Sequence, residues 1–175
     1  RRGLIVVGGL PGARDHEAAA ALAARLGWPV AADIRSGLRL GPAPPGRVPC
    51  LDQILLSTRV RAAFTPDVVL HLGGQPISKR LAQALAALPD AAVIAVRKHP
   101  FRDDPEHRVA IRVQADIGRF CEALARRIDP GTTAKAGARS RMRSTPSATE
   151  CAPRTSKPRN SMARTSRCAK ARSSS

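Results

Sequence analysis

The chain has 175 residues and a formal net charge of +17, which is enough length for one domain and an appendage and enough charge to suggest a nucleic-acid partner. Aromatic residues make up only 2% of it, so the platforms on which nucleic-acid bases stack are nearly absent. No apolar run approaches the roughly 18 residues that span a bilayer, and the four cysteines have no spacing typical of zinc sites or disulfide frameworks. These features predict no membrane partner and a reducing, cytoplasmic location.

Short apolar runs alternate with helical patterns over most of the chain. We predict strands at 3–8, 28–32, 67–72, 90–96 and 109–114, and helices at 18–26, 52–64, 77–88 and 115–128. Asp15 is expected to cap the first helix and Gly27 to end it. In the last strand Val109, Ile111 and Val113 alternate with other residues, which is the period of a half-exposed strand. The alternation predicts an α/β fold with a parallel, Rossmann-like sheet and helices on both faces.

The stretch 66–85 predicts a buried strand, a tight glycine turn and a helix whose apolar face begins at Ile77. Lys79 and Arg80 fall in the first turn of that helix, just past the carboxyl end of the strand, where open parallel sheets bind ligands. Two cations at this place oppose the helix dipole, which prefers anions at the N-terminus. Two interpretations remain open, a solvated first turn or a site for an anionic group.

Two other features near this edge also have a binding and a structural interpretation. The run from Gly8 to Gly12 follows the first strand, but it matches neither GxGxxG nor GxxxxGK[ST], and Pro11 lacks an N–H donor. A plain strand–helix turn is therefore favoured over a phosphate loop. Asp33 follows the second strand, where an acid can contact a ribose in dinucleotide folds. Because the glycine fingerprint is missing, a structural salt bridge within the loop is favoured.

Residues that could ligate a metal occur in one strand and in one loop. His71 lies inside an apolar strand and is interpreted as a hydrogen-bonded core histidine. A polar loop contains His99, Asp103, Asp104, Glu106 and His107. Their spacing matches no standard metal site, so an ordinary polar loop is favoured. We assign no metal-binding, cofactor-binding or catalytic residue.

The net positive charge is concentrated in the tail. Residues 131–175 hold eleven of the 30 Lys and Arg but only one of the 13 acidic residues, so few of their charges are neutralised. The tail has no Val, Ile, Leu, Phe, Trp or Tyr to offset an ordering cost of roughly 1–2 kcal/mol per residue, so we predict disorder. Our hypothesis is a frameshifted translation, which is tested by translating the DNA in the other two frames. The alternative is a genuine basic tail that binds nucleic acid or acidic surfaces non-specifically.

Three segments, in this order and spacing, carry a resemblance to a known family. They are LAARLGWPVAADIRSGLRLG (22–41), PDVVLHLGGQPISKRLAQALA (66–86) and DDPEHR (103–108). Together they resemble the central domain of the thiamine-diphosphate-dependent 2-succinyl-5-enolpyruvyl-6-hydroxy-3-cyclohexene-1-carboxylate synthases of menaquinone biosynthesis. The similarity covers about residues 3–128. We therefore expect 1–130 to be this central domain and 131–175 to be a disordered tail rich in Arg, Ser, Thr and Ala.

The resemblance implies a transferase that uses thiamine diphosphate and Mg²⁺ to join decarboxylated 2-oxoglutarate to isochorismate. Both substrates are anionic, and the family's Lys-Arg pair projects toward the active site, which implies substrate binding by Lys79 and Arg80. The family's active sites lie between subunits, which implies a homo-oligomer.

In the family, an N-terminal domain supplies the glutamate that activates thiamine, and a C-terminal domain supplies the Gly-Asp-Gly…Asn motif that holds Mg²⁺ and the diphosphate. The sequence resembles neither, so we expect a fragment that binds neither cofactor alone and is inactive by itself. One alternative is a stand-alone α/β module with a basic tail that binds nucleic acid or acidic surfaces. A nucleotide-binding domain is disfavoured because the glycine fingerprint is missing.

Overall fold

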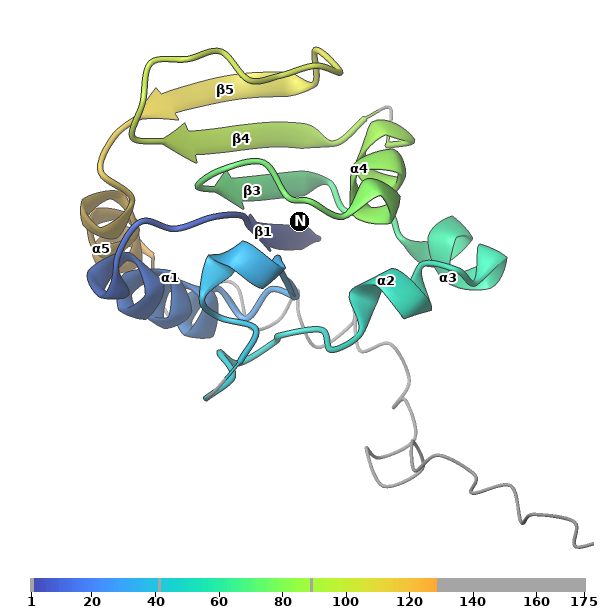
Figure 1. Cartoon of the computed structure of the whole chain (residues 1–175), viewed down its shortest axis with the longest axis horizontal. Helices are drawn as coiled ribbons and strands as arrows, with labels where there is room; N and C mark the ends of the chain where they lie inside the picture. The colour runs from blue at the N-terminus through green and yellow to red at the C-terminus, as the bar shows by residue number, and fades with distance from the viewer. Residues whose placement is uncertain (1, 41, 89, 129–175) are drawn as a thin grey trace, which may run out of the picture. The chain divides into compact units, whose positions relative to one another are not determined.

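The computed structural model describes residues 2–40, 42–88 and 90–128. Within them, all strands are parallel and form one sheet in the order β2-β1-β3-β4-β5, of which Figure 1 labels β1, β3, β4 and β5. The strands are β1 (Gly3–Val7), β2 (Val30–Ala32), β3 (Val68–Leu72), β4 (Ala92–Arg97) and β5 (Val109–Gln114). The predicted parallel α/β sheet is confirmed. The predicted tail 131–175 lies outside the described residues.

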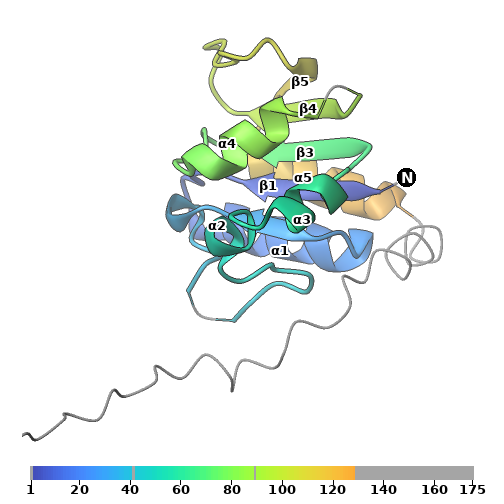
Figure 2. The same ribbon diagram turned by 90° about the vertical axis from the view of Figure 1, so that its right-hand side faces the viewer.

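Helices lie on both sides of the sheet, as Figures 1 and 2 show. They are α1 (Ala13–Leu26), α2 (Leu51–Ile54), α3 (Thr58–Ala63), α4 (Lys79–Ala86) and α5 (Ile117–Arg127), and a 3₁₀ turn spans Ile34–Ser36. In the part of the chain that the structure describes, no helix combines the length and the apolar character needed to cross a membrane.

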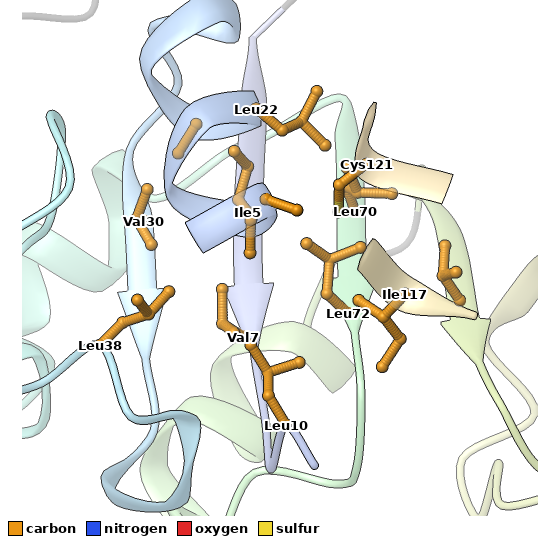
Figure 3. Packing of buried hydrophobic residues seen from close by; sticks show 14 of the residues in the cluster. Ile5, Val7, Leu10, Leu22, Val30, Leu38, Leu70, Leu72, Ile117 and Cys121 are labelled. Atoms are coloured by element: carbon orange, nitrogen blue, oxygen red, sulfur yellow. The ribbon is translucent and has the colours of Figure 1, made fainter. Parts of the chain in front are cut away.

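Alternate residues of the strands point to two separate hydrophobic clusters. Ile5 and Val7 of β1 pack with α1 and α5 on what we call the first face, together with Leu70 and Leu72 of β3 (Figure 3). On the opposite, second face, Leu4 and Val6 of β1 and Val69 of β3 pack with Leu55, Leu81 and Ala84. Because β1 and β3 are buried on both faces, their sequences are apolar throughout rather than alternating.

A short extended segment lies beside β2 at the edge of the sheet. Val30 donates its N–H to the Gly46 carbonyl at 2.8 Å, and its own carbonyl accepts from Val48 N at 2.9 Å. These bonds make a single parallel bridge between Val30 and Arg47. Residues 46–48 therefore extend the sheet by a rudimentary strand, within a segment that the sequence predicts only as a loop.

The prediction that Asp15 caps the first helix is wrong. The helix begins at Ala13, its N-cap is Gly12, and no side chain caps it. Asp15 is buried in the first turn, and its Oδ1 accepts a hydrogen bond of 2.8 Å from Gly118 N at the start of α5. The C-terminal prediction is confirmed, because Gly27 ends the helix with a left-handed φ of 62°.

Three further predictions need correction on the second face and at the sheet edge. The predicted helix 52–64 is divided into α2 and α3, because Leu55 turns into the core and Ser57 starts a new helix by accepting from Val60 N. Ile77 precedes α4 and is exposed, so it is not part of the helix's buried face. In β5 the alternation is interrupted, because the pairing with β4 shifts by one residue between Val93 and Ile94.

Candidate functional site

The carboxyl ends of β1 and β3 are where the strand order reverses, the usual position of a ligand crevice in open α/β sheets. Two glycine turns meet there. Gly74 N donates to the Gly9 carbonyl at 3.0 Å, and Gly8 N donates to the Leu72 carbonyl at 2.9 Å. A Cβ atom on Gly8 would stand 1.7 Å from the Gly74 oxygen. The chain's own backbone therefore fills this crevice, which supports the plain turn and not the phosphate loop.

Asp33 lies at the end of β2 and is buried. Its Oδ1 accepts from Arg35 N at 3.0 Å, and its Oδ2 accepts from Ile77 N at 2.8 Å. The Arg35 guanidinium is 3.8 Å from the same carboxylate and also donates to the Gln75 carbonyl. Since both carboxylate oxygens already have partners, the structural salt bridge is confirmed, and the contact with Ile77 is an addition that the sequence did not reveal.

A second carboxylate holds the start of α4. Ser78 is the N-cap residue, and its Oγ accepts from Leu81 N at 3.0 Å. The Ser78 hydroxyl in turn donates to Asp52 Oδ1, on α2. No local pattern identified Asp52 as a site residue, because its partner lies 26 residues further along the chain.

Lys79 and Arg80 are the first two residues of α4, and both are exposed. Within the described ranges, neither side chain forms a hydrogen bond or an ion pair, whereas several other arginines are paired. Their unfavourable position in the dipole is offset by the two carboxylates of Asp33 and Asp52, which lie at the same helix end. The helix thus presents two unpaired positive charges on a tethered first turn.

A pocket of about 310 Å³ adjoins this helix end. Asp33, Asp52 and Ser78 contribute to its wall, and the exposed side chains of Ile34 and Ile77 contribute apolar surface. Lys79 and Arg80 are not among its lining residues but follow Ser78 directly. The pocket therefore combines apolar walls with an adjacent pair of cations.

His71 lies beside the glycine turns and is buried. Its Nε2 is 2.9 Å from the Gly74 carbonyl, so this nitrogen carries the proton and donates. Burial lowers the pKa of His71 below its ordinary value, and the nearby Arg97 acts in the same direction, although the bond to Gly74 opposes them. The predicted hydrogen-bonded core histidine is confirmed.

Arg97 is a buried charge that the sequence did not reveal. It ends β4, and its Nη1 donates to Asp103 Oδ2 at 2.7 Å. The Asp103 carbonyl accepts from Gln75 Nε2 at 2.8 Å, which connects this loop to the turn after β3. The only sequence signal was an arginine at the end of an apolar strand.

The polar loop that contains His99 to His107 is held by backbone hydrogen bonds. Asp104 accepts from Arg108 N at 2.9 Å and from Val109 N at 3.1 Å. Burial alone would raise the pKa of Asp104, but these two hydrogen bonds outweigh it and lower the pKa. Among the described residues, no group of three or more His, Cys, Asp or Glu could hold a metal ion. The described residues therefore do not fit Mg²⁺. They do not fit a diphosphate either, because backbone atoms of the two glycine turns fill the crevice at the end of β1 and β3.

Comparison with known proteins shows the family. A family model described as "Middle domain of thiamine pyrophosphate" matches residues 1–138. A 2-succinyl-5-enolpyruvyl-6-hydroxy-3-cyclohexene-1-carboxylate synthase of Rubrobacter xylanophilus is 43% identical over 127 residues, which cover 73% of this chain and 22% of that protein. A synthase of the same name from Chlorobium chlorochromatii is 41% identical over 121 residues, which cover 69% of this chain and 20% of that protein.

A plant protein is also similar. The chloroplastic protein PHYLLO of Arabidopsis thaliana is 36% identical over 132 residues, which cover 71% of this chain and 8% of that protein. The chain spans about a fifth of the length of the bacterial synthases that it matches. The resemblance to the central domain of these synthases is confirmed.

Proposed function

The chain belongs to the family of thiamine pyrophosphate middle domains, and we propose that it serves as the central domain of a 2-succinyl-5-enolpyruvyl-6-hydroxy-3-cyclohexene-1-carboxylate synthase. Such an enzyme joins decarboxylated 2-oxoglutarate to isochorismate in menaquinone biosynthesis. The proposal is supported by the synthases that share 41–43% of their residues with this chain over the matched segment. Cytoplasmic location and assembly with further copies are part of the same proposal.

The observation that carries the proposal is the pair of unpaired cations on the first turn of α4. Both substrates carry carboxylates, and exposed Lys and Arg side chains bind carboxylates through charge-assisted hydrogen bonds. Lys79 and Arg80 make no such bond within the described part of the chain, so their donors are available to a ligand. We propose that they bind the carboxylates of 2-oxoglutarate or isochorismate.

The proposed division of labour leaves the cofactor to other residues of the enzyme. Residues 2–40, 42–88 and 90–128 offer no cluster for a metal ion, and the glycine crevice is occupied by backbone. We therefore propose that this domain contributes substrate binding, that thiamine diphosphate and Mg²⁺ contact residues outside the described ranges, and that the chain alone has no synthase activity.

The proposal is tested in a chimera in which residues of this chain replace the matched 127-residue segment of the relative that is 43% identical. Lys79→Ala/Arg80→Ala should lower kcat/KM for one substrate by roughly 100-fold, since each charge-assisted bond contributes about 1.5 kcal/mol or more. The matched control is Arg126→Ala/Arg127→Ala, because these arginines are also adjacent, exposed and on a helix, at the end of α5. Equal losses in the two double variants would contradict the proposed site.

A further inference from the structure

We propose that Asp33 is a positioning residue, which fixes the first turn of α4 and thereby the side chains of Lys79 and Arg80. This inference rests on the proposed function, since it assigns Asp33 a role in the same substrate site. Asp33 is not itself expected to touch the substrate, because both of its carboxylate oxygens accept hydrogen bonds from backbone N–H groups.

The backbone of Asp33 is anchored before its side chain reaches α4. Asp33 N donates to the Val7 carbonyl at 2.9 Å, which ties the residue to the buried strand β1. The Asp33 carbonyl accepts from the buried Ser36 Oγ at 2.6 Å, which closes the 3₁₀ turn. The carboxylate therefore projects from a fixed point of the sheet and not from a free loop.

The carboxylate spans 44 residues of sequence to reach the segment before α4. It accepts from Ile77 N at 2.8 Å, two residues before the helix begins at Lys79. Arg35, held by the same carboxylate, donates to the Gln75 carbonyl. The entry to α4 is thus attached to the end of β2 at two points, and Asp33 is common to both.

Electrostatics gives this attachment a second effect. A helix of eight residues that begins with Lys and Arg places two positive charges at its positive end, which favours unwinding of the first turn. Asp33 and Asp52 bring negative charge to that end. Of the two, only Asp33 is buried, so its charge is less screened by solvent. Removing this charge should release the backbone of the first turn, whereas the rest of α4 stays packed through Ala84.

Asp67 supplies a matched control at the other end of the sheet. It precedes β3, and its carboxylate also accepts from a backbone N–H, that of Arg2 at 2.7 Å, and from the Arg2 guanidinium at 3.0 Å. Its partner Arg2 is exposed, and in the described part of the chain the Asp67 carboxylate makes no hydrogen bond or ion pair with the residues that precede α4. Asp33→Asn and Asp67→Asn therefore make the same chemical change to two similarly bonded carboxylates, of which only one holds the helix.

The experiment uses the full chain labelled with ¹⁵N and 2-oxoglutarate as the probe. Amide hydrogen exchange at Ile77 and Leu81 reports the order of the first turn, and chemical-shift titration at Lys79 and Arg80 reports binding. In Asp33→Asn we expect exchange of the two amides to accelerate and the affinity for the probe to fall, each by about tenfold or more, the effect of losing one charge-assisted hydrogen bond. In Asp67→Asn both measurements should match those of the unsubstituted chain.

The two readouts separate the possible failures. Unchanged exchange at Ile77 and Leu81 in Asp33→Asn would overturn the positioning role. So would faster exchange with unchanged affinity, because the turn would then be held without consequence for binding. If the unsubstituted chain shows no response to the probe at Lys79 and Arg80, the proposed binding of 2-oxoglutarate by this pair fails, and the positioning role of Asp33 in that binding fails with it.

Discussion

On the first face of the sheet the covering helices, α1 and α5, have 14 and 11 residues, whereas on the second face α2 and α4 have only four and eight. The long helices bury a continuous apolar stripe against β1 and β3. The polar groups of the site lie on the short helices and on the turns that precede them: Asp52 is on α2, Ser78 caps α4, the cation pair begins α4, and Asp33 follows β2. The difference indicates that the first face stabilises the domain and that the second face presents its polar groups.

The largest effect expected from this comparison is on the free energy of unfolding. Leu22 of α1 is completely buried on the first face, so Leu22→Ala should cost about 4–5 kcal/mol. Leu81 of α4 is buried on the second face under a shorter helix that can adjust, so Leu81→Ala should cost about 2–3 kcal/mol. Urea denaturation followed by circular dichroism measures both. Equal losses would contradict the proposed difference between the faces.

A smaller effect is expected where the two glycine turns meet. Gly8→Ala would place a Cβ atom 1.7 Å from the Gly74 oxygen and should cost roughly 1–3 kcal/mol of stability, because two backbones would have to separate. Gly74→Ala is the matched control within the same contact, because the Cβ atom that it adds would stand 3.6 Å from the nearest atom, Gly9 N, which is an ordinary van der Waals distance. Its effect should stay within about 0.5 kcal/mol in the same denaturation experiment. A mild Gly8→Ala would show that the crevice can open and that a ligand could enter it.

The sequence predicted the sheet well because the signals of buried strands are local. The central strands β1 and β3 are runs of apolar residues between turn signals. They can be identified from their own sequence, without knowing which strands they pair with. The errors arose where the deciding contact is distant. Asp15 looked like a cap because its true partner, Gly118, lies 103 residues away. Helix 52–64 looked continuous because the burial of Leu55 depends on the sheet beneath it.

The candidate site was predicted only in part for the same reason. Lys79 and Arg80 were identified from their position after a strand and from a family motif. The residues that hold their helix were not, because Asp33 and Asp52 reach it across 44 and 26 residues. Arg97 was missed because its burial depends on how the loop after β4 folds back to place Asp103. Spacing along the chain contains little information about such contacts.

The protein should lose stability at low pH because of His71, which lies buried on the second face. Its pKa in the folded protein is lowered, mainly by burial, from an ordinary value of 6.5, so the unfolded chain takes up the proton at a higher pH than the folded one. Neutral His71 therefore makes its full contribution to the free energy of unfolding above pH 6.5, and this contribution decreases as the pH falls below 6.5. His71→Gln should flatten the dependence of the unfolding free energy on pH in this range. An unchanged slope in His71→Gln would contradict the assignment.

The smallest effect on stability is expected from chemical modification of the thiols. Their reactivity also distinguishes the two faces, because each face carries one of the two cysteines compared. Cys121 is completely buried on the first face, and burial raises its pKa to about 12. Cys50 is exposed and lines the pocket on the second face. Because the thiolate is the reactive form, iodoacetamide should modify Cys50 in the native protein and reach Cys121 only after unfolding. Peptide mapping by mass spectrometry distinguishes the two sites.

Modification of Cys50 should change the free energy of unfolding by less than about 0.5 kcal/mol, because its side chain is exposed. The control is the same labelling in urea above the unfolding transition, where both Cys50 and Cys121 should react. If Cys121 reacts in the native protein as fast as Cys50, then α1 and α5 open readily and the first face is not the more stable one. Protection of Cys121 that disappears in Leu22→Ala would link the thiol directly to the packing of these two helices, since Leu22 and Cys121 belong to the same cluster.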